Sequence, residues 1–260
     1  MNGLLELKQV TKIIQNESDM NNTILDHVDL TIREGDFITV LGGNGAGKST
    51  LFNSITGSQP VTSGRIAFNG KPVTNWPEEK RARFIGRVFQ DPKMGTAPRM
   101  TVEENLLLAL KRGQQRHFFP RRLKENREDF KQLCASVGNG LDNHLDTPTG
   151  HLSGGQRQSL SLLMTTLTQP DLLLLDEHTA ALDPKTSKRL MTLTNQMIQQ
   201  KELTCLMITH RMEDALTYGN RLILMENGKV KLDLNQEEKD KLTLEDLFVL
   251  FEKEEALETV

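Results

Sequence analysis

The chain has 260 residues, of which 37% are hydrophobic and 26% charged, with 19 glycines and 9 prolines. This composition is ordinary for a globular protein and excludes a disordered or collagen-like chain. The 32 basic and 35 acidic residues give a net charge of −3, so the overall balance does not point to a nucleic-acid partner. The two longest apolar runs, residues 106–110 and 247–251, are far shorter than the roughly 20 residues of a membrane-spanning helix.

The first residues and the cysteines indicate the compartment. The chain does not begin with a basic stretch followed by a long apolar one, which predicts no secretion signal. Cys134 and Cys205 are too few for a disulfide framework and fit a reducing environment. Both lie among apolar residues, so we expect them in the core. The sequence therefore predicts a soluble cytoplasmic protein.

Short apolar segments predict the strands of the fold. Residues 28–32 alternate apolar and polar side chains, as in a half-buried strand. Continuous apolar runs indicate further strands at residues 37–41, 172–175, 203–209 and 221–225. Because helices separate these runs, they indicate a parallel sheet that is covered on both faces. Asn227-Gly228 predicts a tight hairpin turn after the last run.

Three predicted helices begin with clear capping signals. Thr101 and Ser153 each stand three residues before a Glu or Gln, which is the capping-box pattern. Asp183 precedes Pro184, which places an N-cap directly before a proline in the first turn. The stretch from about 92 to 152 is polar and mostly helical, and we interpret it as an insertion between core strands.

A glycine-rich segment follows the predicted strand at 37–41 and matches the phosphate-binding pattern G-x-x-x-x-G-K-[ST]. Its residues are Gly42, Gly43, Asn44, Gly45, Ala46, Gly47, Lys48, Ser49 and Thr50. The backbone N–H groups of such a loop surround an anion, and the next helix points its positive end at the same place. We expect Lys48 to neutralise the outer phosphates of a nucleotide and Ser49 to ligate Mg²⁺.

A pair of carboxylates ends the apolar run at 172–175. Asp176 is expected to hold Mg²⁺ through its hydration shell, and Glu177 could polarise an attacking water. Alone, such a pair could equally be a solvated strand end. The phosphate-binding loop in the same chain favours the metal and water roles.

Further motifs resemble those of ABC ATPases. Leu152-Ser153-Gly154-Gly155-Gln156 matches the signature that distinguishes this family from other phosphate-loop proteins. Gln90 resembles the Q-loop glutamine, Ala181-Leu182-Asp183 the D-loop, and His210 the switch histidine. These motifs follow the family's order and spacing over nearly the whole chain.

The resemblance implies an α/β fold with a phosphate-loop (RecA-like) core, a mainly parallel sheet, an N-terminal antiparallel β part and an inserted α-helical subdomain. Residues 1–260 would form one nucleotide-binding domain. Its core would be residues 1–92 and 165–235, its helical insertion residues 93–164, and its acidic C-terminal helix residues 236–260.

The resemblance also implies ATP and Mg²⁺ as cofactors and a second copy of the chain as partner. Two copies would pack head to tail, each ATP lying between the loop of one copy and the signature of the other. The residues implied in nucleotide contacts from the partner side are Ser153, Gly154, Gly155, Gln156 and Asp183. The catalytic set would be Glu177 as general base, His210 holding the γ-phosphate and attacking water, and Gln90. The metal set would be Ser49, Gln90 and Asp176.

Two positions depart from the family pattern. Where the family usually stacks an aromatic ring on adenine, this chain has Ile13 and Ile14, so we expect weak selectivity for ATP over GTP. His178 replaces the common proline after Glu177. It could affect the pH dependence of the base, but we interpret it first as a surface histidine.

The cellular process that ATP hydrolysis powers is inferred from the resemblance alone. We expect a peripheral subunit on the cytoplasmic face of the cell membrane, docked on a separate transmembrane permease and working indirectly with an extracytoplasmic substrate-binding protein. Segments 89–95 and 177–184 look most like bacterial importers of amino acids such as tryptophan or tyrosine.

Other functions remain open at this point. An exporter or lipoprotein-release ATPase is the main alternative. A soluble ABC ATPase acting on DNA or the ribosome would carry two cassettes or a coiled coil, which this chain lacks, so we expect no nucleic-acid partner. A small-molecule kinase would leave the signature and His210 unexplained.

Charge is unevenly distributed along the chain. Residues 111–131 hold eight basic and three acidic residues, around Phe118-Phe119-Pro120. This basic segment could lie near the membrane or the permease, or be a solvated face.

Overall fold

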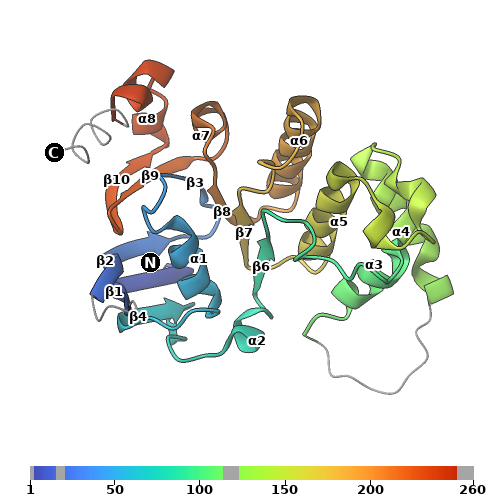
Figure 1. The fold of residues 1–260 in the computed structure, drawn as a ribbon, viewed down its shortest axis with the longest axis horizontal. Helices are drawn as coiled ribbons and strands as arrows, with labels where there is room; N and C mark the ends of the chain where they lie inside the picture. The colour runs from blue at the N-terminus through green and yellow to red at the C-terminus, as the bar shows by residue number, and fades with distance from the viewer. Residues whose placement is uncertain (1–2, 16–20, 114–122, 251–260) are drawn as a thin grey trace. The chain divides into compact units, whose positions relative to one another are not determined.

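The computed structural model describes residues 3–15, 21–113 and 123–250. The chain divides into two compact units, the first made of Met1–Arg81 and Thr204–Val260 and the second of Ala82–Leu203. Each unit contains both strands and helices (Figure 1). The helical segment expected at 93–164 falls within the second unit, which also includes two core strands and a further helix.

The first unit contains an antiparallel sheet with the strand order β2-β1-β4-β5. Its strands are β1 (Leu5–Gln15), β2 (Asn21–Ile32), β4 (Ser63–Phe68) and β5 (Lys71–Pro72). β1 pairs with β2 and with β4, and every pair in this sheet is antiparallel. The N-terminal antiparallel part of the predicted fold is therefore confirmed, and the strand expected at 28–32 is the end of the longer β2.

The same unit contains a second group of strands in the order β10-β9-β3-β8. They are β3 (Phe37–Leu41), β8 (Thr204–Ile208), β9 (Arg221–Glu226) and β10 (Lys229–Asn235). β3 runs parallel to both β8 and β9, and β9 forms with β10 the hairpin predicted at Asn227-Gly228. Every residue of β3 and β8 is buried, as expected for parallel strands covered on both faces.

The helices of the first unit are α1 (Lys48–Thr56), α2 (Glu78–Arg81), α7 (Met212–Thr217) and α8 (Gln236–Lys239). The continuous acidic helix expected at 236–260 is wrong. α8 ends at Lys239, and a separate helical segment covers residues 244–250, while residues 251–260 lie outside the described part of the chain.

A new cap explains this interruption. The Thr243 hydroxyl accepts a hydrogen bond from the Asp246 N–H at 3.2 Å, and the Thr243 N–H donates to the Asp246 carboxylate at 2.8 Å. Such reciprocal bonds begin a helix rather than continue one. The new segment places Leu247 in a core cluster with Leu41 and Leu224.

The second unit is built on the parallel strands β6 (Ile85–Val88) and β7 (Leu172–Asp176). Its helices are α3 (Val102–Leu110), α4 (Leu123–Val137), α5 (Gly154–Thr166) and α6 (Pro184–Gln200), with short 3₁₀ turns at Leu141–His144 and Thr149–His151. α5 lies among α3, α4, α6 and β6 (Figure 1). Its residues 157–166 are all buried. Among the described residues, no helix is long and apolar enough to cross a lipid bilayer.

The three predicted helix caps are confirmed. Thr101 and Ser153 form complete capping boxes at the starts of α3 and α5. Asp183 caps α6 by accepting a hydrogen bond from the Thr186 N–H at 3.1 Å. Both cysteines are buried and free, as expected, and burial raises the pKa of Cys134 to about 12.

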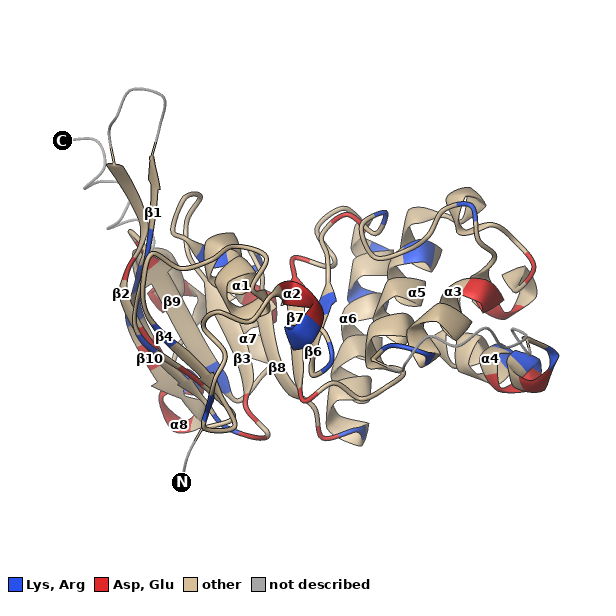
Figure 2. Cartoon of the chain, turned by 90° about the horizontal axis from the view of Figure 1, so that it is seen from below, with Lys and Arg blue, Asp and Glu red and all other residues tan. Residues whose placement is uncertain are grey.

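The part of the basic segment that lies on α4 is balanced in charge. α4 carries Lys124, Arg127 and Lys131 beside three acidic residues, and Figure 2 shows both signs along this helix. Arg127 binds the carboxylates of Glu103 and Asp146 at 2.6 and 2.5 Å. These pairs favour a solvated face for α4, whereas Phe118-Phe119-Pro120 lie outside the described residues.

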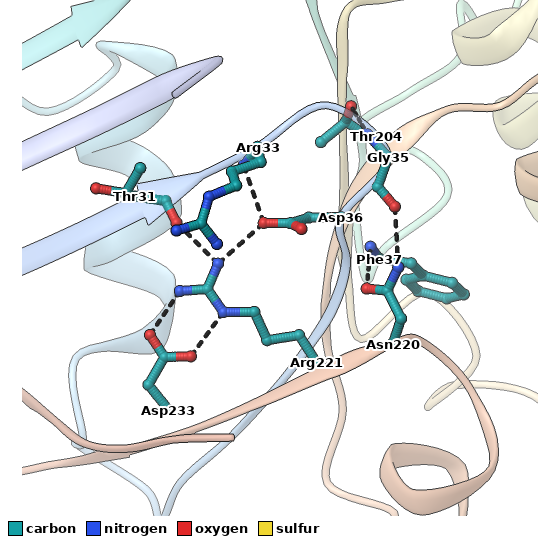
Figure 3. A network of polar contacts seen from close by, with 9 residues as sticks. All are labelled: Thr31, Arg33, Gly35, Asp36, Phe37, Thr204, Asn220, Arg221 and Asp233. Carbon is teal, nitrogen blue, oxygen red and sulfur yellow. Dashed lines mark hydrogen bonds and ion pairs between the residues drawn. The ribbon is translucent and has the colours of Figure 1, made fainter. Parts of the chain in front are cut away.

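A polar network joins the strands of the first unit (Figure 3). Arg221, at the start of β9, binds the Asp233 carboxylate through two nitrogens at 2.6 and 2.5 Å. Its third nitrogen donates to the Thr31 carbonyl at 2.8 Å and to Asp36 at 2.9 Å. The guanidinium therefore links β2, β9, β10 and the turn before β3, and it holds the start of β3 in register.

We predict that Arg221→Met lowers the free energy of unfolding by about 2–3 kcal/mol. Breaking a fully buried ion pair costs about 3–5 kcal/mol, and the loss is smaller here because the Asp233 side chain is 37% exposed. Urea unfolding measures the change. Arg127→Met is the matched control, since its 44% exposed side chain belongs to surface pairs worth about 1 kcal/mol or less. Equal losses in both variants would contradict the structural role of Arg221.

Candidate active site

The glycine-rich loop predicted to bind phosphate connects β3 to α1 in the first unit. Gly47 is the N-cap of α1 and has a left-handed backbone, with φ 94°. A Cβ atom at this position would lie 2.7 Å from the Ile24 carbonyl oxygen, so both the backbone and the space require glycine. Glycine also has no side-chain oxygen, and α1 begins without a side-chain cap, so a bound anion could take the place of one.

Lys48 folds back over this loop. Its ammonium donates to the carbonyl oxygens of Gly42 and Gly43, each at 2.7 Å, and the residue is only 6% exposed. The positive charge is therefore held at the loop where phosphates are expected. Ser49, the next residue, is exposed at the start of α1.

His210 leaves the sheet beside this loop. Val40 of β3 pairs with Ile208 of β8, and the Thr209 N–H donates to the Val40 carbonyl at 3.3 Å. The two parallel strands thus end at the same edge, one leading into the loop and the other into the exposed His210. The first unit thus brings together the loop and His210, the histidine that the sequence predicts as the switch residue.

The second unit repeats this arrangement with β6 and β7. Val88 pairs with Leu175, so Gln90 and the two carboxylates follow strands that end at the same edge. Asp176 is buried at the end of β7, and Glu177 is partly exposed with a left-handed backbone of φ 46°. A non-glycine residue in this region is uncommon and is held there by its surroundings.

Arg87 is a functional candidate that the sequence analysis missed. Its guanidinium lies 2.5 Å from a carboxylate oxygen of Asp176, and both side chains are 13% exposed. An arginine inside the short, otherwise apolar strand at 85–88 was the signal that could have identified it.

The signature and the D-loop lie side by side in the second unit. Ser153 and Gly154 are exposed at the start of α5, and a Cβ atom on Gly154 would lie 3.7 Å from the Leu182 side chain. Asp183 is exposed at the cap of α6, where hydrogen bonds from Thr186 lower its pKa. The two helix starts can therefore face a partner together.

The expectation of a surface His178 is wrong. The residue is 2% exposed, and its Nε2 lies 3.0 Å from the Thr194 hydroxyl on α6. Because that hydroxyl donates its own proton to the Leu190 carbonyl at 2.8 Å, it accepts from His178. Burial lowers the pKa of His178 to about 4, so the ring is neutral at pH 7.

The positions expected near adenine lie on β1. Ile13 is partly buried and Ile14 is 37% exposed. Neither offers an aromatic face, and the weak preference for ATP over GTP stays a prediction.

Comparisons with known proteins place this geometry in context. A family model described as ABC transporter matches residues 25–180. A tyrosine transport ATP-binding protein of Clostridioides difficile is 43% identical over 249 residues, covering 96% of this chain and 99% of that protein. The spermidine/putrescine import ATP-binding protein PotA of Haemophilus influenzae is 33% identical, and the match spans 88% of this chain but 57% of that protein.

Solved structures agree in fold. A dimeric ATP-binding cassette, MJ0796, in a post-hydrolysis state with ADP and phosphate bound, has a TM-score of 0.76 at 26% identity, covering 89% of this chain and 98% of that one. CbiO1 of Clostridium perfringens, part of the transporter complex cbiONQ, has a TM-score of 0.72 at 27% identity, covering 97% of this chain and 100% of that one. The expected α/β cassette fold is confirmed by both.

We predict that stability falls as the pH drops from about 6.5 towards 4, in part through His178. In this range His178 becomes protonated in the unfolded chain but stays neutral in the folded protein. Protonation of the unfolded chain therefore lowers the free energy of unfolding by about 3 kcal/mol by the time the pH reaches 4. Urea unfolding at several pH values measures the slope. His178→Gln removes the titrating group and should flatten the curve, whereas an unchanged slope would contradict the low pKa.

Proposed function

Because this chain belongs to the ABC transporter family and is an ABC-type ATPase, we propose that it is the energy-coupling subunit of an importer for tyrosine or a related amino acid. The near-full-length likeness to the tyrosine transport ATP-binding protein carries this proposal. The spermidine/putrescine relatives are also import proteins, which favours import over export. No residue of this subunit is assigned to the cargo.

The phosphate loop supports the proposed ATP site. Lys48 would exchange its two loop carbonyls for the outer phosphates of ATP, which offer a stronger, charged acceptor. The uncapped start of α1 would supply backbone N–H groups and the positive end of the helix to the same phosphates.

The chemistry of the expected metal ligands fits Mg²⁺. Asp176 offers a carboxylate, Gln90 an amide oxygen and Ser49 a hydroxyl, and Mg²⁺ prefers such oxygen donors while keeping several waters. When bound, the metal would neutralise charge on the phosphates. These three residues would hold it.

Glu177 is proposed as the general base. Its position directly after β7 puts it next to Asp176, and its left-handed backbone fixes the direction in which the chain leaves the strand. His210 would orient the γ-phosphate and the attacking water. Gln90 would report the state of the site to the helical part of the second unit.

The signature is proposed to act on ATP held by a second copy. The Ser153 hydroxyl already accepts from the Gln156 N–H at 3.3 Å, while Gly154 and Gly155 leave the helix start open to an anion. Asp183, beside them, would contact the same partner. A head-to-tail pair of this kind has twofold symmetry and two equivalent sites.

The remaining partners follow from the proposed role. A transmembrane permease would carry the cargo, and an extracytoplasmic substrate-binding protein would deliver it. The subunit would then be peripheral, on the cytoplasmic face of the membrane.

We predict that Glu177→Gln keeps ATP binding but slows hydrolysis by about 10²–10⁴-fold, because it removes the general base. With ATP and Mg²⁺ the variant should accumulate as a dimer, measured by size-exclusion chromatography with light scattering. Adding Lys48→Ala to the same variant should abolish that dimer. A Glu177→Gln protein that stays monomeric and hydrolyses ATP at the wild-type rate would overturn the role of Glu177.

The transport role predicts that the tagged chain co-purifies from membranes with a permease, and that its deletion lowers cellular uptake of labelled tyrosine. Uptake of labelled putrescine serves as the matched control and should not change. If the deletion lowers putrescine uptake and leaves tyrosine uptake normal, the transported substrate is a polyamine rather than an amino acid. If the tagged chain instead co-purifies with ribosomes or DNA and with no membrane protein, the transport proposal is wrong.

A further inference from the structure

The carboxylate proposed to serve Mg²⁺ is already paired with a cation of this chain. A guanidinium nitrogen of Arg87 on β6 lies 2.5 Å from Asp176 Oδ2 at the end of β7. Because both side chains are 13% exposed, water screens the pair poorly and the attraction is stronger than in a surface ion pair.

A built surrounding holds Arg87 in this place. The guanidinium carbon lies 4.8 Å from the centre of the Phe89 ring, which is the distance of a cation–π contact. The Phe89 carbonyl accepts a hydrogen bond at 2.9 Å from the Gln158 side chain on the signature helix α5. Three elements of one unit, β6, β7 and α5, therefore fix the position of this arginine.

We propose that Arg87 sets the magnesium affinity of the active site by competing with Mg²⁺ for the Asp176 carboxylate. This inference rests on the proposed ATP and Mg²⁺ site. A carboxylate attracts Mg²⁺ through its negative charge, and a guanidinium on the same group cancels most of that charge. Magnesium must then share Asp176 with Arg87 or displace it.

Competition predicts the direction in which Mg²⁺ affinity changes when Arg87 is replaced. Removing the positive charge should strengthen Mg²⁺ binding, whereas an arginine that only oriented Asp176 for the metal would weaken binding when removed. Arg87→Met keeps much of the length and the apolar stem but has no charge. Arg87→Lys keeps the charge and loses the planar fork, so it should stay closer to the wild type.

The test measures the binding of a fluorescent, non-hydrolysable ATP analogue while Mg²⁺ is titrated. We expect Arg87→Met to reach half of its Mg²⁺-dependent gain in affinity at about 5–10-fold lower Mg²⁺ than the wild type. Arg127→Met, which removes a surface arginine of the same unit, should not shift the titration. An unchanged or higher Mg²⁺ requirement in Arg87→Met would overturn the proposal.

Binding of the analogue in EDTA separates this inference from the proposed function. If the wild type fails to bind the analogue with or without Mg²⁺, the ATP site itself is wrong. If it binds and responds to Mg²⁺, only the role of Arg87 is under test.

A second variant guards against misfolding of Arg87→Met. Phe89→Leu leaves both charges in place but removes the ring face that holds the guanidinium. We expect a shift to lower Mg²⁺ of about 2–3-fold. If Arg87→Met does not fold and Phe89→Leu titrates like the wild type, the proposal fails.

Discussion

The parallel pairing of two buried strands inside each unit is the constraint on which the functional residues depend. β3 with β8 brings the phosphate loop and His210 to one edge, and β6 with β7 does the same for Gln90 and the carboxylates. All residues of β3, β7 and β8 are buried. A slip in register would exchange closely packed side chains for others of different shape, which a dense interior does not tolerate. The register of the backbone therefore positions the side chains at and just after the ends of these strands, among them the buried Asp176 and the exposed His210.

The starts of α1, α5 and α6 also shape the site, and they differ in whether a side chain caps the helix. Ser153 and Asp183 cap α5 and α6 with their own side chains, so both helices are stable without a ligand. Gly47 begins α1 with no side chain, and a neighbouring carbonyl leaves no room for one. The helix whose first N–H groups are proposed to bind phosphate therefore begins without a side-chain cap, unlike α5 and α6.

Three arginines of low exposure show how the same side chain serves different ends. Arg81 donates to backbone carbonyls, among them those of Ser54 and Ile55. Arg221 neutralises Asp36 and Asp233 and ties strands together. Both are structural, because their partners have no other proposed role. Arg87 instead pairs with Asp176, whose proposed partner is a metal, so the same kind of contact becomes a competition.

Much of the site was predictable from the sequence, because glycine spacing, caps and apolar runs act over a few residues. The phosphate loop, the signature and the caps of α3, α5 and α6 are of this kind, and so is the hairpin at Asn227-Gly228. His178 was misjudged because its burial depends on α6, whose Thr194 stands 16 residues further along the chain. The break before Thr243 was missed because a local cap there outweighed helix-favouring composition.

The sequence by itself determined which groups the chain carries and the order in which strands and helices present them. Local hydrogen bonding and hydrophobic periodicity are enough for that. Only the tertiary structure decided which charges meet, since Arg87 and Asp176 stand 89 residues apart and touch because β6 and β7 pair in parallel. It likewise decided that His178 is neutral and buried, because desolvation depends on everything packed around the ring.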